Sequence, residues 1–90
     1  MNRFHGDLLM GGVRLRELDG EIDEVVHGDD ELWSGRFRVD RKQQSLFEIG
    51  RPYLLVLDDG RSGQVEVTNI TGEEDREAVL IRFRPVTRPK

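Results

Sequence analysis

The sequence predicts a small all-β domain, either an antiparallel meander barrel or a two-sheet sandwich of five to six strands. Short apolar-rich runs recur along the chain, separated by turn signals every 8–14 residues, which is typical of small barrels and sandwiches. The stretch from Tyr53 to Ile70 holds two such runs on either side of Asp59-Gly60, a pair that favours a tight hairpin turn. Runs of 10–15 residues with helical periodicity are missing, so crossover helices and a parallel sheet are not expected.

The N-terminal third predicts two short strands joined by a turn. Val13 to Leu18 is expected to form the first strand, and Leu8 to Met10 extends it if Gly11-Gly12 forms a bulge or bend inside it. Asp19-Gly20 then predicts a turn, after which Ile22 to His27 pairs back as a short strand.

Leu32 to Asp40 is the clearest strand of the first half. It follows a turn signal at Gly28-Asp29-Asp30, and its large apolar residues alternate with polar ones, as in a strand with one buried face. Arg41 to Ser45 is polar and is expected to form a loop or a single helical turn. Gly50-Arg51-Pro52 closes this segment, because a proline biases the residue before it toward extended geometry.

The hairpin at Asp59-Gly60 has two alternative registers. A two-residue type I′ turn pairs Val65 with Leu54, whereas a three-residue loop with a bulge at the glycine pairs Val65 with Tyr53. The Tyr53–Leu57 run is apolar on both faces, so its second face needs a cover from barrel closure or from another chain. We expect closure within one chain, because six strands suffice for a small barrel.

The last strand is predicted over Ala78 to Arg84, after an acidic loop from Thr71 to Glu77. Because only a proline-containing tail follows it, Ala78–Phe83 is expected to be an open sheet edge. The predicted core consists of apolar residues at alternating strand positions, namely Leu15, Ile22, Trp33, Phe37, Val39, Leu55, Leu57, Val65, Val67, Val79, Ile81 and Phe83.

The composition predicts one domain over residues 1–90, with flexible polar ends at 1–7 and 86–90. Apolar and charged residues each make up 36% of the chain, and no apolar run approaches the ~20 residues that span a bilayer. The chain has no cysteine, which excludes disulfides and thiolate metal sites. Since the N-terminus lacks an apolar signal sequence, we expect a cytoplasmic location without membrane contact.

The net charge of −4 is unevenly distributed. Residues 1–32 hold nine acidic residues against three arginines, a net of −6, and residues 33–90 hold nine against eleven Lys and Arg, a net of +2. The acidic part argues against a general nucleic-acid binder, because neutralisation of phosphates dominates such binding. It still permits a local basic face.

Arg-x-Arg patterns supply the candidate ligand-binding residues. In Arg36-Phe37-Arg38 and Arg82-Phe83-Arg84, as in Arg14-Leu15-Arg16, strand alternation places two guanidinium groups on one face. Guanidinium pairs grip phosphate or carboxylate, so the predicted ligand-binding residues for an anion, nucleotide or nucleic acid are Arg36, Arg38, Arg82, Arg84 and Trp33. The same pattern also fits a solvated sheet face neutralised across strands by Glu17, Asp40, Glu48 and Glu66, and we give this interpretation more weight.

Catalytic and metal-binding patterns are weak. The acidic run that begins at Asp19 fails the calcium-loop pattern, since Glu24 stands where that loop requires glycine. His5 and His27 lack the spacing of a metal-binding pair, and Ser62 lies in a hairpin rather than at a strand-to-helix elbow. We therefore expect no enzyme activity, no cofactor and no metal.

The leading hypothesis is a non-enzymatic protein-interaction or structural module. It would contact a protein partner through an edge strand, with Ala78–Phe83 as the docking edge, and exist as a monomer or weak homodimer. The alternative is anion, nucleotide or nucleic-acid binding through the Arg-x-Arg faces. Acidic residues interleaved with the arginines would favour the first hypothesis, and a contiguous basic face would favour the second.

Overall fold

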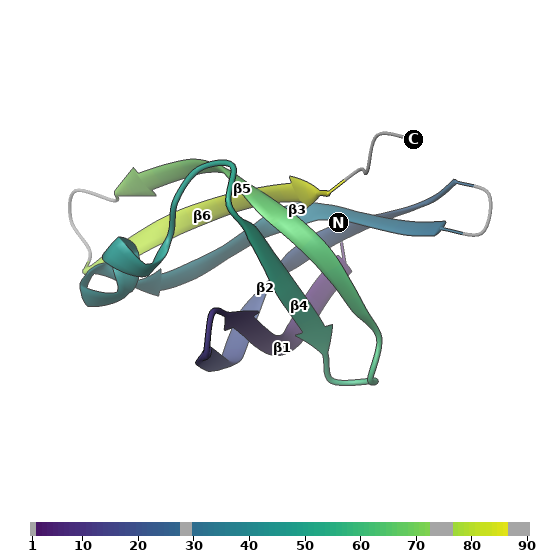
Figure 1. The fold of residues 1–90 in the computed structure, drawn as a ribbon, viewed down its shortest axis with the longest axis horizontal. Helices are drawn as coiled ribbons and strands as arrows, with labels where there is room; N and C mark the ends of the chain where they lie inside the picture. The colour runs from purple at the N-terminus through teal and green to yellow at the C-terminus, as the bar shows by residue number, and fades with distance from the viewer. Residues whose placement is uncertain (1, 28–29, 73–76, 87–90) are drawn as a thin grey trace.

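The computed structural model describes residues 2–27, 30–72 and 77–86. Six antiparallel strands close into a barrel in the order β1-β2-β3-β6-β5-β4 (Figure 1). The elements are β1 (Asn2–Met10), β2 (Val13–His27), β3 (Asp30–Asp40), the 3-10 helix η1 (Arg41–Leu46), β4 (Pro52–Leu57), β5 (Ser62–Gly72) and β6 (Ala78–Pro85). The predicted all-β class is confirmed, and of the two predicted architectures the chain adopts the barrel.

Parts of four predicted segments lie outside the described residues. They are the centre of the turn at residues 28–29, most of the acidic loop at 73–76, and the polar ends at residue 1 and residues 87–90.

Barrel closure pairs the two halves of the chain. β1, β2 and β3 are consecutive neighbours, as are β4, β5 and β6, and the halves meet where β3 pairs with β6 and β1 pairs with β4. β6 therefore has β3 on one side and β5 on the other. The prediction that Ala78–Phe83 is an open docking edge is wrong, because closure brings a strand from the first half of the chain against it.

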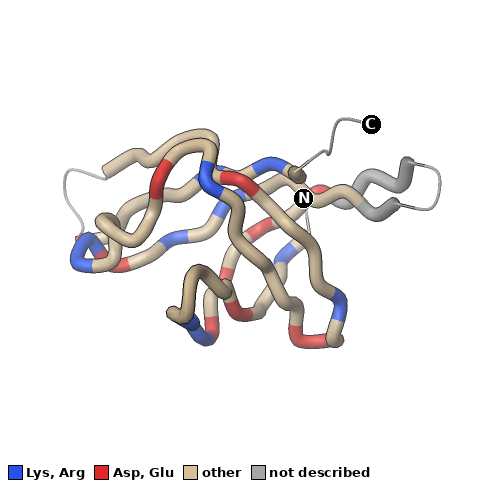
Figure 2. The backbone as a smooth tube through the Cα atoms, in the orientation of Figure 1, with Lys and Arg blue, Asp and Glu red and all other residues tan. Residues whose placement is uncertain are grey.

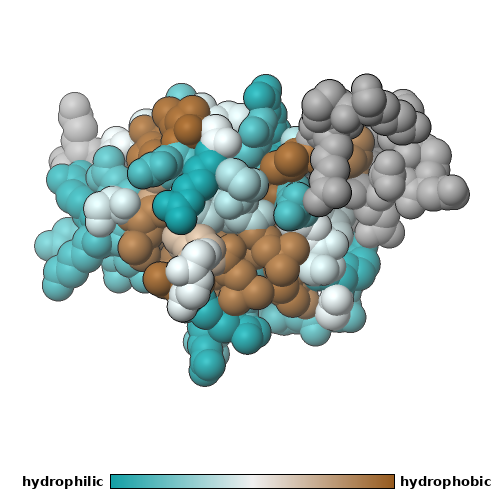
Figure 3. Space-filling model, viewed as in Figure 1, coloured by the Kyte–Doolittle hydropathy of each residue, from teal (hydrophilic) through white to brown (hydrophobic). Residues whose placement is uncertain are grey.

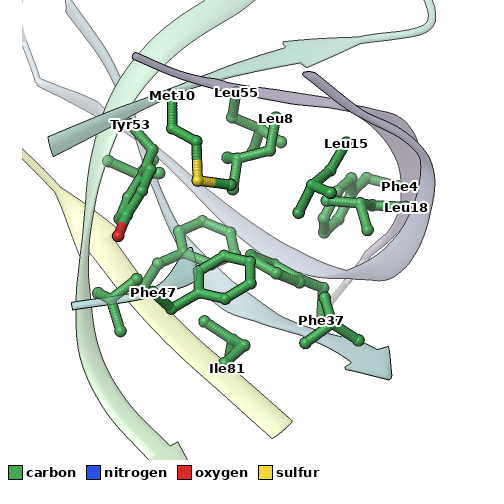
Figure 4. Packing of buried hydrophobic residues seen from close by; sticks show 14 of the residues in the cluster. Phe4, Leu8, Met10, Leu15, Leu18, Phe37, Phe47, Tyr53, Leu55 and Ile81 are labelled. Carbon is green, nitrogen blue, oxygen red and sulfur yellow. The ribbon is translucent and has the colours of Figure 1, made fainter. Parts of the chain in front are cut away.

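The inward-facing residues of all six strands fill the barrel interior (Figure 4). All twelve residues of the predicted core are buried, with exposed fractions of 8% or less. Phe37 lies in an aromatic cluster, with its ring centroid 5.7 Å from that of Phe47 and 5.8 Å from that of Phe83. The sequence pattern does not identify six further buried residues, which are Phe4, Leu8, Met10, Leu18, Phe47 and Tyr53.

The N-terminal segment is a strand of the barrel. The sequence places residues 1–7 outside the strands, and this is wrong for residues 2–7, which belong to β1 and pair with β2 along one side. Phe4 and Leu8 are buried at alternate positions of β1. A segment that looks polar as a whole therefore supplies core residues from one face only.

Two glycine signals of the N-terminal third differ from their predicted roles. Gly11 and Gly12 have positive φ angles of 48° and 89° and form a two-residue hairpin turn between β1 and β2, not a bulge inside one strand. Asp19-Gly20 is not a turn, because β2 continues through it without reversal.

Gly20 allows a close approach of neighbouring side chains. A Cβ atom at this position would lie 2.6 Å from the Phe4 ring and 2.9 Å from the Cβ atom of Phe37. Glycine therefore makes room for side chains from β1 and β3 on the inner side of β2, as glycines within strands commonly do.

The β4–β5 hairpin adopts the second of its two predicted registers. Tyr53 lies opposite Val65, and the Leu57 N–H donates to the Arg61 carbonyl at 2.7 Å, which closes a three-residue loop. Of the described loop residues only Gly60 has a positive φ, of 92°. The loop is thus a type I turn followed by a glycine bulge, since a type I′ turn needs two residues with positive φ.

The apolar character of β4 on both faces is only partly explained by closure. Tyr53, Leu55 and Leu57 are buried in the core, whereas Leu54 and Val56 face outward and are half-buried. Figure 3 shows apolar surface on the side of the barrel where β4 lies in front. Closure within one chain is confirmed, and it leaves this outer apolar face in contact with solvent.

The segment between β3 and β4 forms a single helical turn, one of its two predicted alternatives. η1 is followed by Phe47, which enters the core. The Tyr53 hydroxyl accepts a hydrogen bond from the Glu48 N–H at 2.8 Å and donates to the Leu46 carbonyl at 3.2 Å. This buried hydroxyl thereby attaches the end of η1 to β4.

Replacing Gly60 by valine is expected to lower the free energy of unfolding by about 1–3 kcal/mol, because a β-branched residue resists positive φ. Apart from chain neighbours, no atom of the described residues lies within 4 Å of a Cβ at this position, so the loss reports backbone strain. Chemical denaturation beside Ser62→Ala, a small change on the exposed start of β5, measures it. Equal losses in the two variants would contradict the assigned turn.

Candidate functional site

The four predicted ligand-binding arginines lie on the outer face of β3 and β6. Arg36 and Arg82 are direct cross-strand neighbours. Arg38 lies one alternation further along β3 on one side of this pair, and Arg84 lies one alternation further along β6 on the other side. The barrel brings the central pair together and places the other two arginines at opposite ends of the group.

Carboxylates interleave with these arginines. Arg36 Nη2 donates to Glu21 Oε1 of β2 at 3.2 Å, and Arg84 Nε pairs with Glu66 of β5. Figure 2 shows Lys and Arg next to Asp and Glu along these strands. Glu66 is one of the neutralising residues that the sequence suggests, whereas Glu21 becomes identifiable only when β2 and β3 are paired. The face is mixed in sign, and we attribute to such exposed pairs only ~0–1 kcal/mol each.

Trp33 belongs to the core rather than to the surface, with 3% of its area exposed. Its ring packs against Gly63 of β5, where a Cβ would lie 3.1 Å away, and the Arg61 guanidinium carbon lies 5.8 Å from the ring centroid. The indole Nε1 is buried without a hydrogen-bond partner among the described residues. An unpaired buried donor costs about 1–3 kcal/mol. Trp33 therefore stabilises the core through the burial of its large apolar ring and not through its N–H group.

His5 of β1 joins two neighbouring elements. Its Nδ1 atom is 2.8 Å from Asp58 Oδ2 in the β4–β5 loop, and its Nε2 atom is 4.0 Å from Asp19 Oδ1 of β2. The hydrogen bond to Asp58 raises the pKa of His5, and the charges of Asp58, Asp19 and Glu17 add to this shift against a lowering by desolvation. The imidazolium form therefore ties β1 to the loop.

A shallow hollow of about 540 Å³ lies over Gly20, lined by Arg3, Phe4, His5, Asp19, Gly20, Glu21 and Arg38. Its volume is within the ~300–1,000 Å³ range of small-molecule sites. Its lining is mainly charged and of both signs, whereas small-molecule sites are mostly apolar with a few convergent polar groups. The hollow therefore does not distinguish a ligand class.

A bulge interrupts β2 opposite β1. β2 carries one extra residue between Leu15 and Leu18, and within it Glu17 has a positive φ of 57°. The Glu17 N–H donates to Asp7 Oδ1 at 3.1 Å, while Arg14 Nε donates to Asp7 Oδ2 at 2.8 Å. These two bonds hold the pKa of Asp7 below its ordinary value and fix the bulge in place.

Two stretches of β2 have a free backbone edge among the described strands. β2 pairs with β3 only from Gly20 onward, so Val13–Asp19 has no strand on that side. β2 pairs with β1 only as far as Ile22, so Asp23–His27 has no strand on the other side. The first stretch contains the Glu17 bulge, and the second is regular in register.

β2 and β3 continue past the barrel as a two-stranded arm, which we define as residues 23–27 and 30–34. The arm begins where β1 ends against Ile22 and where the pairing of β3 with β6 ends at Gly35, although β6 itself continues to Pro85 against β5. β2 and β3 stay paired with each other along its whole described length. Figure 1 shows the arm reaching beyond the other strands. Each of its two strands therefore has one edge without a described neighbour.

The alternation of hydrogen bonds identifies which β2 residues face the free edge. The Asp58 N–H donates to the His5 carbonyl at 3.0 Å, so the backbone of His5 faces the β4 side of β1. Its cross-strand partner Asp19 then faces β3, and successive residues of β2 alternate from there. Beyond the end of β1, Glu24 and Val26 thus direct their N–H and C=O groups to the free edge.

The same alternation applies to β3. Trp33 lies opposite Glu24, and Glu31 lies opposite Val26. Since both members of such a pair turn their backbone groups away from each other, Trp33 and Glu31 direct theirs away from β2. Trp33 is only 3% exposed, so its backbone groups are buried, and Glu31 is the outward position of β3 that remains. The pair of donors and acceptors that a further antiparallel strand requires lies on the β2 edge of the arm, at Glu24 and Val26.

The chain matches no protein-family model, and no curated protein or solved structure is significantly similar to it. In the described part of the chain, no helix is long and apolar enough to cross a membrane. Among residues 2–27, 30–72 and 77–86, no group of three or more His, Asp or Glu residues is placed to hold a metal ion. Function must therefore be inferred from the geometry of the chain itself.

The contact between His5 and Asp58 predicts stability that decreases as the pH rises. Because the folded-state pKa of His5 lies above its ordinary value of 6.5, its contribution is fully present below that pH and is lost as the pH rises through the folded pKa. Denaturation at about pH 5.5 and about pH 8.5 should show that the stability difference between wild type and His5→Gln shrinks at the higher pH. Asp58→Asn is the matched control, and it should weaken the same pH dependence. A difference that is equal at both pH values would rule out this role of the imidazolium.

Proposed function

We propose that this chain is a non-enzymatic protein-interaction module whose arm receives an extended segment of a partner protein. The observation that carries the proposal is the backbone edge of the arm at Glu24 and Val26 on β2, which has no partner strand among the described residues. Extended peptides add to such edges through main-chain hydrogen bonds. The module is proposed to act in the cytoplasm, without a cofactor, as a monomer or weak homodimer.

The contrast between the two free edges of β2 supports this proposal. Proteins protect exposed edges with bulges, because a regular edge is a template for pairing with another chain. The edge at Val13–Asp19 carries the bulge that Asp7 fixes around Glu17. The edge at Asp23–His27 keeps regular pairing with β3 up to the tip of the arm. One edge is thus blocked, while the other keeps the geometry that an added strand needs.

The marginal stability of the arm gives a second argument. A two-stranded ribbon is only marginally stable in water, and a third strand is needed for independent stability. Beyond Ile22 and Gly35 the arm has two strands only among the described elements. A partner segment that supplies the third strand would stabilise the arm on binding.

Anion, nucleotide or nucleic-acid binding is the second candidate function. The observation in its favour is the direct cross-strand contact of Arg36 and Arg82. We rank it second because Arg36 and Arg84 already pair with Glu21 and Glu66, which makes the face mixed in sign.

Selection of extended peptides against the full chain tests the first proposal. Random displayed peptides should yield binders that protect the Glu24 and Val26 amides, or that of Glu31, from hydrogen exchange. Val26→Pro and Glu31→Pro each remove an outward-facing N–H and leave the hydrogen bonds between β2 and β3 in place, so together they should abolish binding. Val26→Ala with Glu31→Gln is the matched control, because it changes the same side chains and keeps both N–H groups, and it should retain binding.

Two results would contradict the proposal. One is a set of binders that bind the double variant of Val26→Pro and Glu31→Pro as tightly as the wild type. The other is a set of binders whose amide protection maps to the barrel and spares the arm. Hydrogen exchange of the free double variant serves as the control for folding. It should show that β2 and β3 are still paired in the arm, so that a loss of binding is not a consequence of unfolding.

The ranking of the second candidate predicts that the wild-type chain shows no salt-sensitive binding to nucleotides or single-stranded nucleic acid at physiological salt. Fluorescence anisotropy with labelled oligonucleotides measures this. Charge reversal of Arg36 and Arg82 is the matched variant. Micromolar binding that weakens with salt and disappears in this variant would reverse the ranking.

A further inference from the structure

The arm lies in the most acidic stretch of the chain. Residues 17–35 contain eight Asp and Glu and no Lys or Arg, and residues 23–34 hold five of the eight. Acidic residues stand at consecutive register positions on both strands, at Asp23 and Glu24 of β2 and at Asp30 and Glu31 of β3. A strand added to either edge therefore pairs beside acidic residues.

The charges of the arm limit what can pair with it. Like charges directly opposite on neighbouring strands disfavour pairing, and opposite charges favour it. A second copy of this chain is a poor occupant, because two arms side by side bring the same acidic residues within one Debye length of about 10 Å. Nucleic acids and anionic lipid surfaces are repelled for the same reason.

We infer that the partner of the arm is an extended segment rich in Lys and Arg, supplied by a different protein. This inference rests on the proposed function of the arm as a strand acceptor. Main-chain hydrogen bonds to Glu24 and Val26 position the segment. Its cationic side chains then meet the acidic positions of the arm, which selects the partner by charge and accelerates association.

The inference differs from simple electrostatic attraction. A basic peptide held only by charge would bind anywhere on the acidic surface and would tolerate loss of a backbone N–H. A basic strand held by the arm needs both the charge and the edge. The two contributions are therefore separable by variants that remove one and keep the other.

Three capped synthetic peptides of equal length test the inference, built from repeating Val-Lys-Lys, Val-Ser-Ser and Val-Glu-Glu units. Titration calorimetry with the full chain should show that the Val-Lys-Lys peptide binds at least about tenfold tighter than the Val-Ser-Ser peptide. The difference should shrink as the salt concentration rises. The Val-Glu-Glu peptide should not bind measurably.

Two variants separate charge from edge. Asp30→Asn with Glu31→Gln keeps side-chain size and removes two charges, so it should reduce binding of Val-Lys-Lys and leave Val-Ser-Ser unchanged. Val26→Pro with Glu31→Pro removes outward-facing N–H groups together with the Glu31 charge, so its control is Val26→Ala with Glu31→Gln, which removes the same charge and keeps both N–H groups. The proline variant should abolish binding of both peptides, and the control should still bind them. Amide hydrogen exchange of the complexes should show protection at Glu24 and Val26.

Each failure has a distinct meaning. Equal binding of Val-Lys-Lys and Val-Ser-Ser, lost in the proline variant, would overturn the charge inference and leave the strand-acceptor function standing. Binding of Val-Lys-Lys that survives in the proline variant would show attraction by charge alone and overturn both. No binding of Val-Lys-Lys at low salt would overturn the inference, while the peptide selection described above decides on the function.

Discussion

The contact of Phe4, Phe37 and Phe83 across the barrel interior is the interaction on which the rest of the fold depends. The ring of Phe83 meets that of Phe4 edge to face at 6.3 Å and lies 5.8 Å from that of Phe37. Gly20 of β2 lies beside these rings, and a Cβ there would overlap the Phe4 ring. Glycine leaves this space to the rings at the point where β2 pairs with both β1 and β3.

The candidate site arises because β2 pairs with β1 on one side and with β3 on the other, over different lengths. β2 has 15 residues and β1 has nine, so β2 must overhang β1 where it continues with β3. β2 extends past its pairing with β1 at one end and past its pairing with β3 at the other, and each extension leaves one edge without a strand among the described residues. Asp7 fixes the bulge at Glu17 on one of these stretches, and the other stretch is part of the arm. Closure of the barrel pairs the edge expected at β6 and leaves the arm outside the closed part.

The fold class, the core and the β4–β5 turn are predictable from the sequence because they depend on alternation and on local turn chemistry. The arm is not, because Asp19-Gly20 carries the same local signal as Asp59-Gly60 and only the second forms a turn. Gly20 instead lies in a continuous strand, paired with Phe4 of β1 and Phe37 of β3, and no local signal reveals these two distant partners. Likewise, alternation places the arginines on one outer face, but it cannot show that Glu21 pairs with Arg36 across β2 and β3.

The separation of charge between barrel and arm gives the arm two properties at once. On the barrel, arginines of β3 and β6 pair with glutamates of β2 and β5, so cations and anions offset each other within the sheet. Residues 23–34 have acidic residues and no Lys or Arg. Repulsion between identical arms discourages self-association of a regular edge, as charged residues do on natural edge strands. In the function that we propose, the same charge leaves that edge accessible to a strand of opposite sign, so protection against aggregation and choice of partner would have a single physical cause.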